Sequence, residues 1–337
     1  MFDVQAASVP LRILLTGSSG WLGRHLAPML RAAGHDVFGL DVAPGPDTAI
    51  VGSICDDWLV HRSIAENGID AVIHAGALHK PDVARRPAQA FVDVNVTGTL
   101  NLLEAAVAAG VERFVLTSTT SLMINTAIRN EHGDAAVWLD ETSGPLEPRN
   151  IYGATKLAAE HLCRLHHLEH GLNCVILRTS RFFPEEDDSD RGLCGPNLKA
   201  NEFLHRRLSA EDAAHAHLVA LDQAPSIGFD TFLVSAPTPF ARCDAAELKR
   251  DAAAVIARLF PDAAALYADR GWQLPNSIGR VYDSARIERE LGFRCATDFA
   301  AILDALRSGD PLPFTHDADY VAPTTPPPSP PQRSGWA

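Results

Sequence analysis

Short apolar runs of the strand type alternate with longer segments of helical spacing from about Leu11 onward. The runs expected to form strands are LRILLTG, DVFGLD, AVIHAGA, RFVLTST and CVILRTS. The segments expected to form helices include GWLGRHLAPMLRAAG, VTGTLNLLEAAVAAG and the stretch from about Tyr152 to His170. This alternation is typical of a parallel sheet whose crossover helices cover its faces. The pattern therefore predicts an α/β fold with a doubly wound parallel sheet.

The regular alternation ends after Arg181, which indicates a second part of the chain. An acidic loop PEEDDSD, a helix around SAEDAAHAHLVALD, a strand TFLVSA and helical segments to about Leu306 follow. We expect residues 1–180 to form one domain, and residues 181–315 to complete the sheet and add a smaller C-terminal lobe. The proline-rich, polar sequence near the end predicts a flexible tail over residues 316–337.

Charge and cysteine usage exclude several classes of partner and compartment. The formal net charge of −13 opposes binding to nucleic acid and to anionic membrane surfaces. The 6 cysteines are scattered without a CxxC pair, which favours a reducing cytoplasm. The N-terminus MFDVQAASVP has no apolar signal-peptide core, and no later run is long enough to span a membrane. These observations favour a cytoplasmic protein.

The segment TGSSGWLG lies directly between the first expected strand and the first expected helix. Gly17 permits a tight turn, Gly20 lets the backbone approach a pyrophosphate, and Gly23 lets the helix pack closely on the strand. The free N–H groups at the helix start then face the phosphates. The residues expected to contact the dinucleotide here are Gly17, Ser19, Gly20, Trp21, Leu22 and Gly23. Glycine patterns also occur in ordinary turns, but this position in the chain predicts a dinucleotide site of the Rossmann type.

Asp41 ends the second expected strand, 24 residues after Gly17. An acid at roughly this spacing binds the ribose hydroxyls of the adenosine in Rossmann sites. A carboxylate would repel the 2′-phosphate of NADP, and no Arg or Lys follows in VAPGPD. The sequence therefore predicts NAD as the cofactor, with a solvated strand end as the alternative role for Asp41.

The motif YGATK places Tyr152 and Lys156 on one face at the start of a helix. A free tyrosine has a pKa of about 10, and a neighbouring ammonium lowers the pKa of the phenol by favouring its ionised form. Such a phenol can remove the proton of an alcohol. The spacing alone also occurs at the start of ordinary amphipathic helices, but here it follows a dinucleotide motif and a strand that ends in Thr117, Ser118 and Thr119.

Taken in order, these motifs resemble the extended short-chain dehydrogenases/reductases of the NAD-dependent epimerase/dehydratase group. The segments that carry the resemblance are TGSSGWLG, HAGA, NVTGTLNLLEAA, TST, YGATK and DSARIERELGF. The resemblance implies a Rossmann domain with a C-terminal substrate lobe. It also implies a homodimer that pairs through the helix near Leu100 to Ala109 and the helix that carries Tyr152.

The resemblance also implies roles for individual residues. Thr119 would hydrogen-bond the reacting alcohol, with Ser118 as the alternative if the register differs by one. Tyr152 would be the general acid/base, and Lys156 would also hold the nicotinamide ribose. Ser53 and Ile54 would lie beside the adenine, and Asn95 would fix the active-site helix. Further cofactor contacts are expected at Ala75, Gly76, Ala77 and Thr117, and substrate contacts at His79, Ser118, Thr119, Arg181 and Arg206.

The chain departs from the group's pattern where nucleotide sugars are held. Arg181 stands at the position of an expected Asn, and His205 and Gln273 stand at or near positions where an Arg is usual. Arg206 and Arg207 directly follow His205, and Arg270 and Arg280 are near Gln273. These departures argue against a standard UDP-sugar substrate. Thr120 and Ser121 replace the Asp-Glu pair of the dehydratases, which argues against dehydration.

Three functions remain open. The leading one is a sugar epimerase, and the alternative is an alcohol or polyol dehydrogenase that releases NADH. The third, a non-catalytic NAD-sensing regulator, is disfavoured by the presence of Thr119, Tyr152 and Lys156. Pairs such as His166 with His170 are expected to lie on a solvated helix face, and no metal site is predicted.

Overall fold

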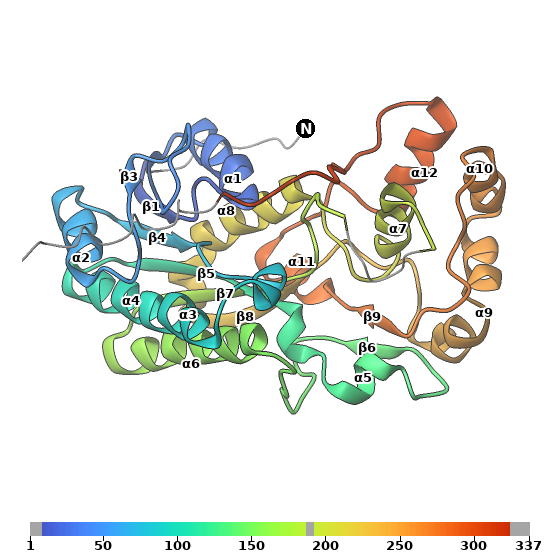
Figure 1. Cartoon of the computed structure of the whole chain (residues 1–337), viewed down its shortest axis with the longest axis horizontal. Helices are drawn as coiled ribbons and strands as arrows, with labels where there is room; N and C mark the ends of the chain where they lie inside the picture. Colours follow the sequence, from blue (N-terminus) through green and yellow to red (C-terminus); the bar gives the residue numbers. More distant parts are fainter. Residues whose placement is uncertain (1–8, 187–191, 324–337) are drawn as a thin grey trace, which may run out of the picture.

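Within residues 9–186 and 192–323, which the computed structural model describes, seven strands form one parallel sheet (Figure 1). Its order is β3-β2-β1-β4-β5-β7-β8. These strands are β1 (Arg12–Thr16), β2 (Asp36–Asp41), β3 (Ile50–Val51), β4 (Ala71–His74), β5 (Arg113–Thr119), β7 (Asn173–Thr179) and β8 (Phe229–Val234). All neighbours are parallel, so the strands end at the same edge of the sheet. The predicted doubly wound Rossmann fold is confirmed.

Helices cover both faces of this sheet. The helices on one face are α1 (Trp21–Ala32), α8 (Ala210–Ile227) and α11 (Ala285–Leu291). Those on the other are α2 (Asp57–Glu66), α4 (Gly98–Ala108), which continues from α3 (Ala88–Val92), and α6 (Ile151–His170). In β1, Ile13 and Leu15 enter the first core and Leu14 the second, because successive strand residues point to opposite faces.

A smaller lobe packs beside the carboxyl edge of the sheet. Its elements are α5 (Thr126–Asn130), β6 (Val137–Leu139), α7 (Gly195–Glu202), α9 (Ala245–Leu259), α10 (Ala263–Asp269), β9 (Arg280–Tyr282) and α12 (Phe299–Ser308). Strands β6 and β9 form a separate two-stranded parallel sheet, in which Val137 pairs with Arg280. The stretch from Asn125 to Asn150, expected to be turn-rich, thus contributes a helix and a strand to the lobe. A strand of 3 residues is too short to show an alternating pattern.

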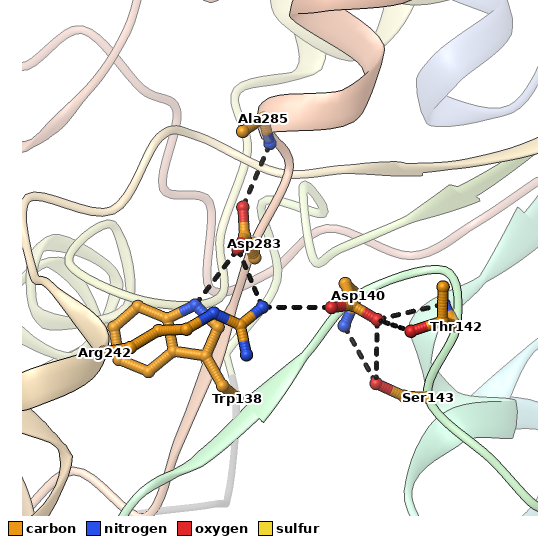
Figure 2. A network of polar contacts seen from close by, with 7 residues as sticks. All are labelled: Trp138, Asp140, Thr142, Ser143, Arg242, Asp283 and Ala285. Atoms are coloured by element: carbon orange, nitrogen blue, oxygen red, sulfur yellow. Dashed lines mark hydrogen bonds and ion pairs between the residues drawn. The ribbon is translucent and has the colours of Figure 1, made fainter.

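Figure 2 shows the polar network that ties β6 to the end of β9. Asp283, directly after β9, accepts hydrogen bonds from Trp138 Nε1 at 3.2 Å and from Arg242 at 3.1 Å. The same guanidinium donates to Asp140 at 3.0 Å. Asp140 also accepts the backbone N–H of Thr142 at 3.0 Å. The network therefore fixes the position of β9 within the lobe.

The prediction of a flexible tail from residue 316 is wrong for residues 316–323. The backbone N–H of Asp317 donates to the carbonyl of Pro184 at 2.9 Å. Tyr320 packs edge-on against Trp21, with 5.1 Å between ring centroids. These contacts carry the chain from α12 back to α1 (Figure 1). Residues 324–337 of the predicted tail, and the Asp187–Asp190 part of the acidic loop, lie outside the described residues.

Candidate active site

The loop between β1 and α1 has the geometry of a dinucleotide-binding turn. Gly17 adopts a φ of 74°, and a Cβ at this position would lie 2.7 Å from the backbone nitrogen of Gly76. A Cβ on Gly23 would lie 2.3 Å from the carbonyl oxygen of Gly17. Both positions therefore require glycine, the first for backbone conformation and the second for close packing of α1 on the turn.

The start of α1 is suited to an anion. The N-cap residue Gly20 offers no side-chain hydrogen bond, and the first turn contains no acid. The N–H groups of Trp21 and Leu22, at the positive end of the helix dipole, are therefore left for a phosphate. Within the described residues, the indole Nε1 of Trp21 is also buried without a partner. These features fit the pyrophosphate of a dinucleotide.

Asp41 lies at the end of β2, beside this turn. Its two carboxylate oxygens accept the backbone N–H of Ser19 at 3.0 Å and that of Ala43 at 2.9 Å. Each oxygen keeps further acceptor capacity for a ribose hydroxyl. The carbonyl of Asp41 accepts the N–H of Gly52, which places Ser53 next to it. Ile54 is buried, and its carbonyl accepts a hydrogen bond from Asn101 at 2.9 Å.

A chain of buried polar groups connects β1 with β4 and α4. The hydroxyl of Thr16 accepts the N–H of Gly76 at 3.0 Å and lies 2.7 Å from His74 Nδ1. The other ring nitrogen of His74 lies 3.0 Å from the hydroxyl of Thr99. That hydroxyl donates to the carbonyl of Asn95 at 2.7 Å. His74 and Thr99 were not predicted from the sequence, since single polar residues in apolar runs give no pattern.

Asn95 joins this chain of groups to the helix of the predicted catalytic pair. Its side-chain oxygen accepts the N–H of Leu78, and its amide donates to the carbonyl of Leu78, both at 2.9 Å. The same amide donates to the hydroxyl of Thr155 in α6 at 3.1 Å. Asn95 therefore holds the loop of Ala75, Gly76 and Ala77 against the turn of α6 that carries Tyr152.

Thr119 and Tyr152 are brought together at the end of β5. Helix α6 begins at this edge because the side chain of Asn150 caps it by accepting the N–H of Gly153 at 2.9 Å. A hydrogen bond from Thr119 acts on the Tyr152 phenol to lower its pKa, but burial has the larger effect and raises that pKa to about 12. In this ligand-free structure the expected lowering of the Tyr152 pKa by Lys156 is therefore not seen. Burial, to which the charge of Asp82 adds, outweighs the hydrogen bond from Thr119.

Lys156 is 2% exposed, one helical turn after Tyr152. Burial lowers the pKa of Lys156 to about 8, although Glu160 partly opposes this. The ammonium is therefore held in a site that gives it little hydration. In the free protein the ammonium of Lys156 lacks such partners as a ribose hydroxyl or a developing phenolate, either of which would stabilise it.

Two hydroxyls at the end of β5 point to structural partners instead. Ser118 donates to Glu160 at 2.5 Å, and Arg178 donates to the same carboxylate at 2.7 Å. Thr117 lies 2.7 Å from Nε2 of His217 in α8. The hydroxyl of Ser118 is thus not placed in the candidate substrate site, and that of Thr117 faces α8 rather than the cofactor loop. Of the three hydroxyl residues at the end of β5, Thr119 is the one that acts on the Tyr152 phenol.

The predicted substrate contacts lie on two sides of the site. His79 stacks on Phe183 with 4.8 Å between ring centroids. Arg181 and Arg206 both bind Glu202, at 2.8 and 3.0 Å. Arg207 binds the other oxygen of this carboxylate at 2.7 Å. Glu202 was not predicted, because it ends α7 and the arginines that bind it lie outside this helix, where helical spacing gives no signal.

The described residues contain no group of three His, Cys, Asp or Glu side chains that could hold a metal ion. The expectation that His166 lies on a solvated helix face is wrong, because this residue is buried in α6 and its Nδ1 lies 2.9 Å from the carbonyl of Leu162. In the same part of the chain, no helix has both the length and the apolar character that a bilayer crossing requires.

Comparison with known proteins places the chain in a family. Residues 13–196 match the NAD dependent epimerase/dehydratase family, and this span is more than half of the 337 residues. The chain belongs to this family. The family is NAD-dependent, which confirms the prediction of NAD as cofactor and of an enzyme of the extended short-chain dehydrogenase/reductase type.

The similar proteins are dehydrogenases and related enzymes. The chain is 30% identical to a 3-beta-hydroxysteroid dehydrogenase of Mycolicibacterium neoaurum, over 64% of this chain and 63% of that protein. It is 27% identical to a uronate dehydrogenase of Pseudomonas syringae pv. tomato, over 66% of this chain and 79% of that protein. A solved short-chain dehydrogenase/reductase superfamily protein from Agrobacterium tumefaciens with bound NAD superposes with a TM-score of 0.62 and 27% identity, over 88% of this chain and 96% of the other.

The geometry of Asp41 generates a prediction about cofactor choice. The parent protein should bind NAD more tightly than NADP by on the order of 100-fold, because the carboxylate pairs with ribose hydroxyls and repels a 2′-phosphate. Asp41→Asn should reduce this ratio at least tenfold, since it removes the charge but keeps an oxygen for the N–H of Ser19. Titration of intrinsic fluorescence with each dinucleotide measures the ratio. Equal binding of NAD and NADP by the parent would contradict this role.

Burial of Lys156 generates a prediction about stability. The pKa of Lys156 is lower in the folded state than in the unfolded chain, so the protonated lysine destabilises the ligand-free fold below pH 8, and stability recovers as pH rises from about 8 toward 10.5. Lys156→Met should therefore raise the free energy of unfolding at pH 7, by up to about 3 kcal/mol, while NAD affinity falls. Urea unfolding measures the first and NAD titration the second.

Lys249→Met is the matched control, because Lys249 pairs with Glu131 at 2.7 Å and should give no gain in stability. A Lys156→Met protein that is less stable than the parent, or that binds NAD equally well, would show that the lysine is only a packing residue.

Proposed function

We propose that the protein is an NAD-dependent oxidoreductase that moves a hydride at a secondary alcohol carbon of a sugar or sugar-like substrate. The observation that carries the proposal is the contact of Thr119 with the Tyr152 phenol, on the same sheet edge as the dinucleotide turn. A substrate hydroxyl that binds between these two side chains would meet the hydroxyl of Thr119 as a hydrogen-bond donor and the phenol of Tyr152 as a proton acceptor. Membership of the NAD dependent epimerase/dehydratase family supports the same reaction class.

In the proposed reaction, Thr119 orients the substrate hydroxyl and Tyr152 exchanges its proton. NAD, when bound, supplies the hydride acceptor and a cationic ring. With a pKa of about 12 in the ligand-free structure, the phenol is protonated at neutral pH and is ready to act as an acid toward a carbonyl. To act as a base, it must lose this proton more easily, and the ammonium of Lys156 favours that once substrate excludes water from the site.

Two reactions fit these roles. An epimerase returns the hydride to the opposite face of the same carbon, and this was the leading interpretation of the sequence. A dehydrogenase releases NADH, and the similarity to two dehydrogenases supports it as the second candidate. A purely NAD-sensing protein would need neither Thr119 nor Tyr152 at the site.

We also propose a homodimer that pairs through α4 and α6. These helices lie side by side on one face of the sheet (Figure 1). On α6, Leu165 is 44% exposed and Leu168 is 70% exposed. A second copy that covers these leucines would remove apolar area from water.

Tyr152→Phe should lower turnover by roughly 10² to 10⁴-fold, as expected for loss of a general acid/base, and leave NAD affinity nearly unchanged. Tyr267→Phe removes a hydroxyl from a tyrosine of the lobe core and should keep full activity. The measurement is the rate of NADH formation, or of product formation by chromatography, over a panel of sugars and polyols. Near-parent turnover by Tyr152→Phe would overturn the proposed function.

The same panel separates the two reactions. A dehydrogenase should accumulate NADH absorbance in proportion to product. An epimerase should show no net absorbance change, convert the sugar into its epimer and retain NAD through gel filtration. Net NADH formation that matches product would exclude the epimerase interpretation.

A further inference from the structure

Arg280 is a buried arginine whose side chain has no partner among the described residues. It lies in β9, and only 7% of the residue is exposed. Within residues 9–186 and 192–323, its guanidinium takes part in no hydrogen bond and no ion pair, and its Nε is fully buried. The nearby carboxylate of Glu131, which lies against Gly279, pairs with Lys249 instead. A buried guanidinium without a counter-charge is unfavourable, so its presence points to a partner that is not part of the protein.

The strand directs Arg280 toward the catalytic segment. Residues two apart in a strand share a face, so Arg280 and Tyr282 point to the same side of β9. Tyr282 packs in a small cluster with Leu122, Met123 and Ile124, which follow Thr119 along the chain. Val281, between them, packs in the core of the lobe. The guanidinium therefore lies on the side of β9 that faces the active site.

Other arginines surround the same place. Arg149, directly before the cap of α6, donates through Nε to the carbonyl of Ile124 at 3.0 Å. The charge of Arg280 lowers the pKa of both Arg149 and Arg206, in addition to the larger effect of burial. The carboxylate of Glu202 is already shared by Arg206 and two further arginines. The surplus of positive charge is thus concentrated between the catalytic segment and the lobe.

The backbone on both sides of the Arg280 side chain is held in place. The carbonyl of Arg280 lies 2.9 Å from Nδ1 of His205, and the carbonyl of His205 accepts the N–H of Tyr282 at 2.9 Å. Asp283, the next residue after β9, is fixed by the network with Trp138 and Arg242 (Figure 2). The strand that carries Arg280 is therefore a fixed support for its side chain.

We propose that Arg280, with Arg206 beside it, forms an oxyanion subsite, and that the substrate is a sugar carrying a carboxylate or phosphate close to the reacting carbon. This proposal rests on the proposed function and narrows its substrate class. Guanidinium groups bind both oxyanions through paired hydrogen bonds. Arg206 and Arg280 lie near, but not at, the positions His205 and Gln273, where the nucleotide-sugar enzymes were expected to carry the arginines that hold a diphosphate.

The test compares charged and neutral forms of the same sugars with the NAD-loaded full chain. The probes are D-glucuronate and D-galacturonate, glucose 6-phosphate and galactose 6-phosphate, and the neutral D-glucose and D-galactose. The parent should bind at least one anionic probe about 100-fold more tightly than its neutral form, measured by calorimetry. A preference confined to the uronates identifies a carboxylate, and one confined to the phosphates identifies a phosphate.

Arg280→Met, which replaces the aliphatic part of the side chain and removes the guanidinium, should lose at least about tenfold of the affinity for the anionic probe and leave that for the neutral sugar unchanged. Its ligand-free melting temperature should equal or exceed that of the parent, since an unpaired buried charge has been removed. Arg280→Lys should recover part of the anion affinity. Arg62→Met, at an exposed position of α2, is the control and should change neither affinity.

No preference of the parent for any anionic probe, or an equal loss for charged and neutral sugars in Arg280→Met, would overturn the subsite. These outcomes differ from failure of the proposed function. If a neutral sugar is oxidised in a Tyr152-dependent way without an anionic preference, the oxidoreductase stands and only the subsite is wrong. If turnover does not depend on Tyr152, the proposed function itself is wrong.

Discussion

The candidate site depends on one constraint, the parallel order of β2, β1, β4 and β5 as direct neighbours. Parallel strands end at one edge, so Asp41, Gly17, Ala75 and Thr119 come to that edge from segments far apart in the chain. The buried hydroxyl of Thr16 then holds the ends of β1 and β4 together through Gly76 and His74. The dinucleotide turn and the catalytic hydroxyl are thereby parts of one rigid frame.

Local sequence was sufficient to predict much of this frame. The glycine turn, Asp41 and the pair of Tyr152 with Lys156 depend on spacing within one loop or one helix turn, and the structure places them at the predicted positions. The choice between Thr119 and Ser118 was not decidable in this way. The choice depends on which of the two hydroxyls is already hydrogen-bonded to a residue of α6. Here Ser118 donates its hydroxyl to Glu160 of that helix.

The remaining parts of the site depend on contacts between distant segments. Strand β6 pairs with β9 across more than a hundred residues, and each has 3 residues, so neither gives a periodic signal. Glu202 binds arginines from two segments. Arg207 is close to it in sequence, whereas Arg181 is far from it. The pKa of Tyr152 also differs from the expectation, because burial of the phenol is a property of the folded site and not of the YGATK spacing.

Two buried cations give the site its chemical character. Lys156 and Arg280 are 2% and 7% exposed, and within the described residues neither has a carboxylate in hydrogen-bond contact. In each case folding removes a charge from water without full compensation, which is unfavourable for the free protein. Such groups are typical of functional sites, where the ligand supplies the missing partner. The stability of the ligand-free fold is therefore expected to be limited by the features that bind cofactor and substrate.

The central claim is that Asp41, Tyr152 and Lys156 are arranged around a single bound NAD. A crystal structure of the protein with NAD tests it most directly, through the distance from nicotinamide C4 to the hydroxyl of Tyr152. We expect a distance on the order of 5 Å, so that one substrate carbon and its hydroxyl can reach both, with the carboxylate of Asp41 bound to the adenosine ribose. A nicotinamide ring more than about 10 Å from Tyr152, in a complex with the ribose on Asp41, would contradict the claim.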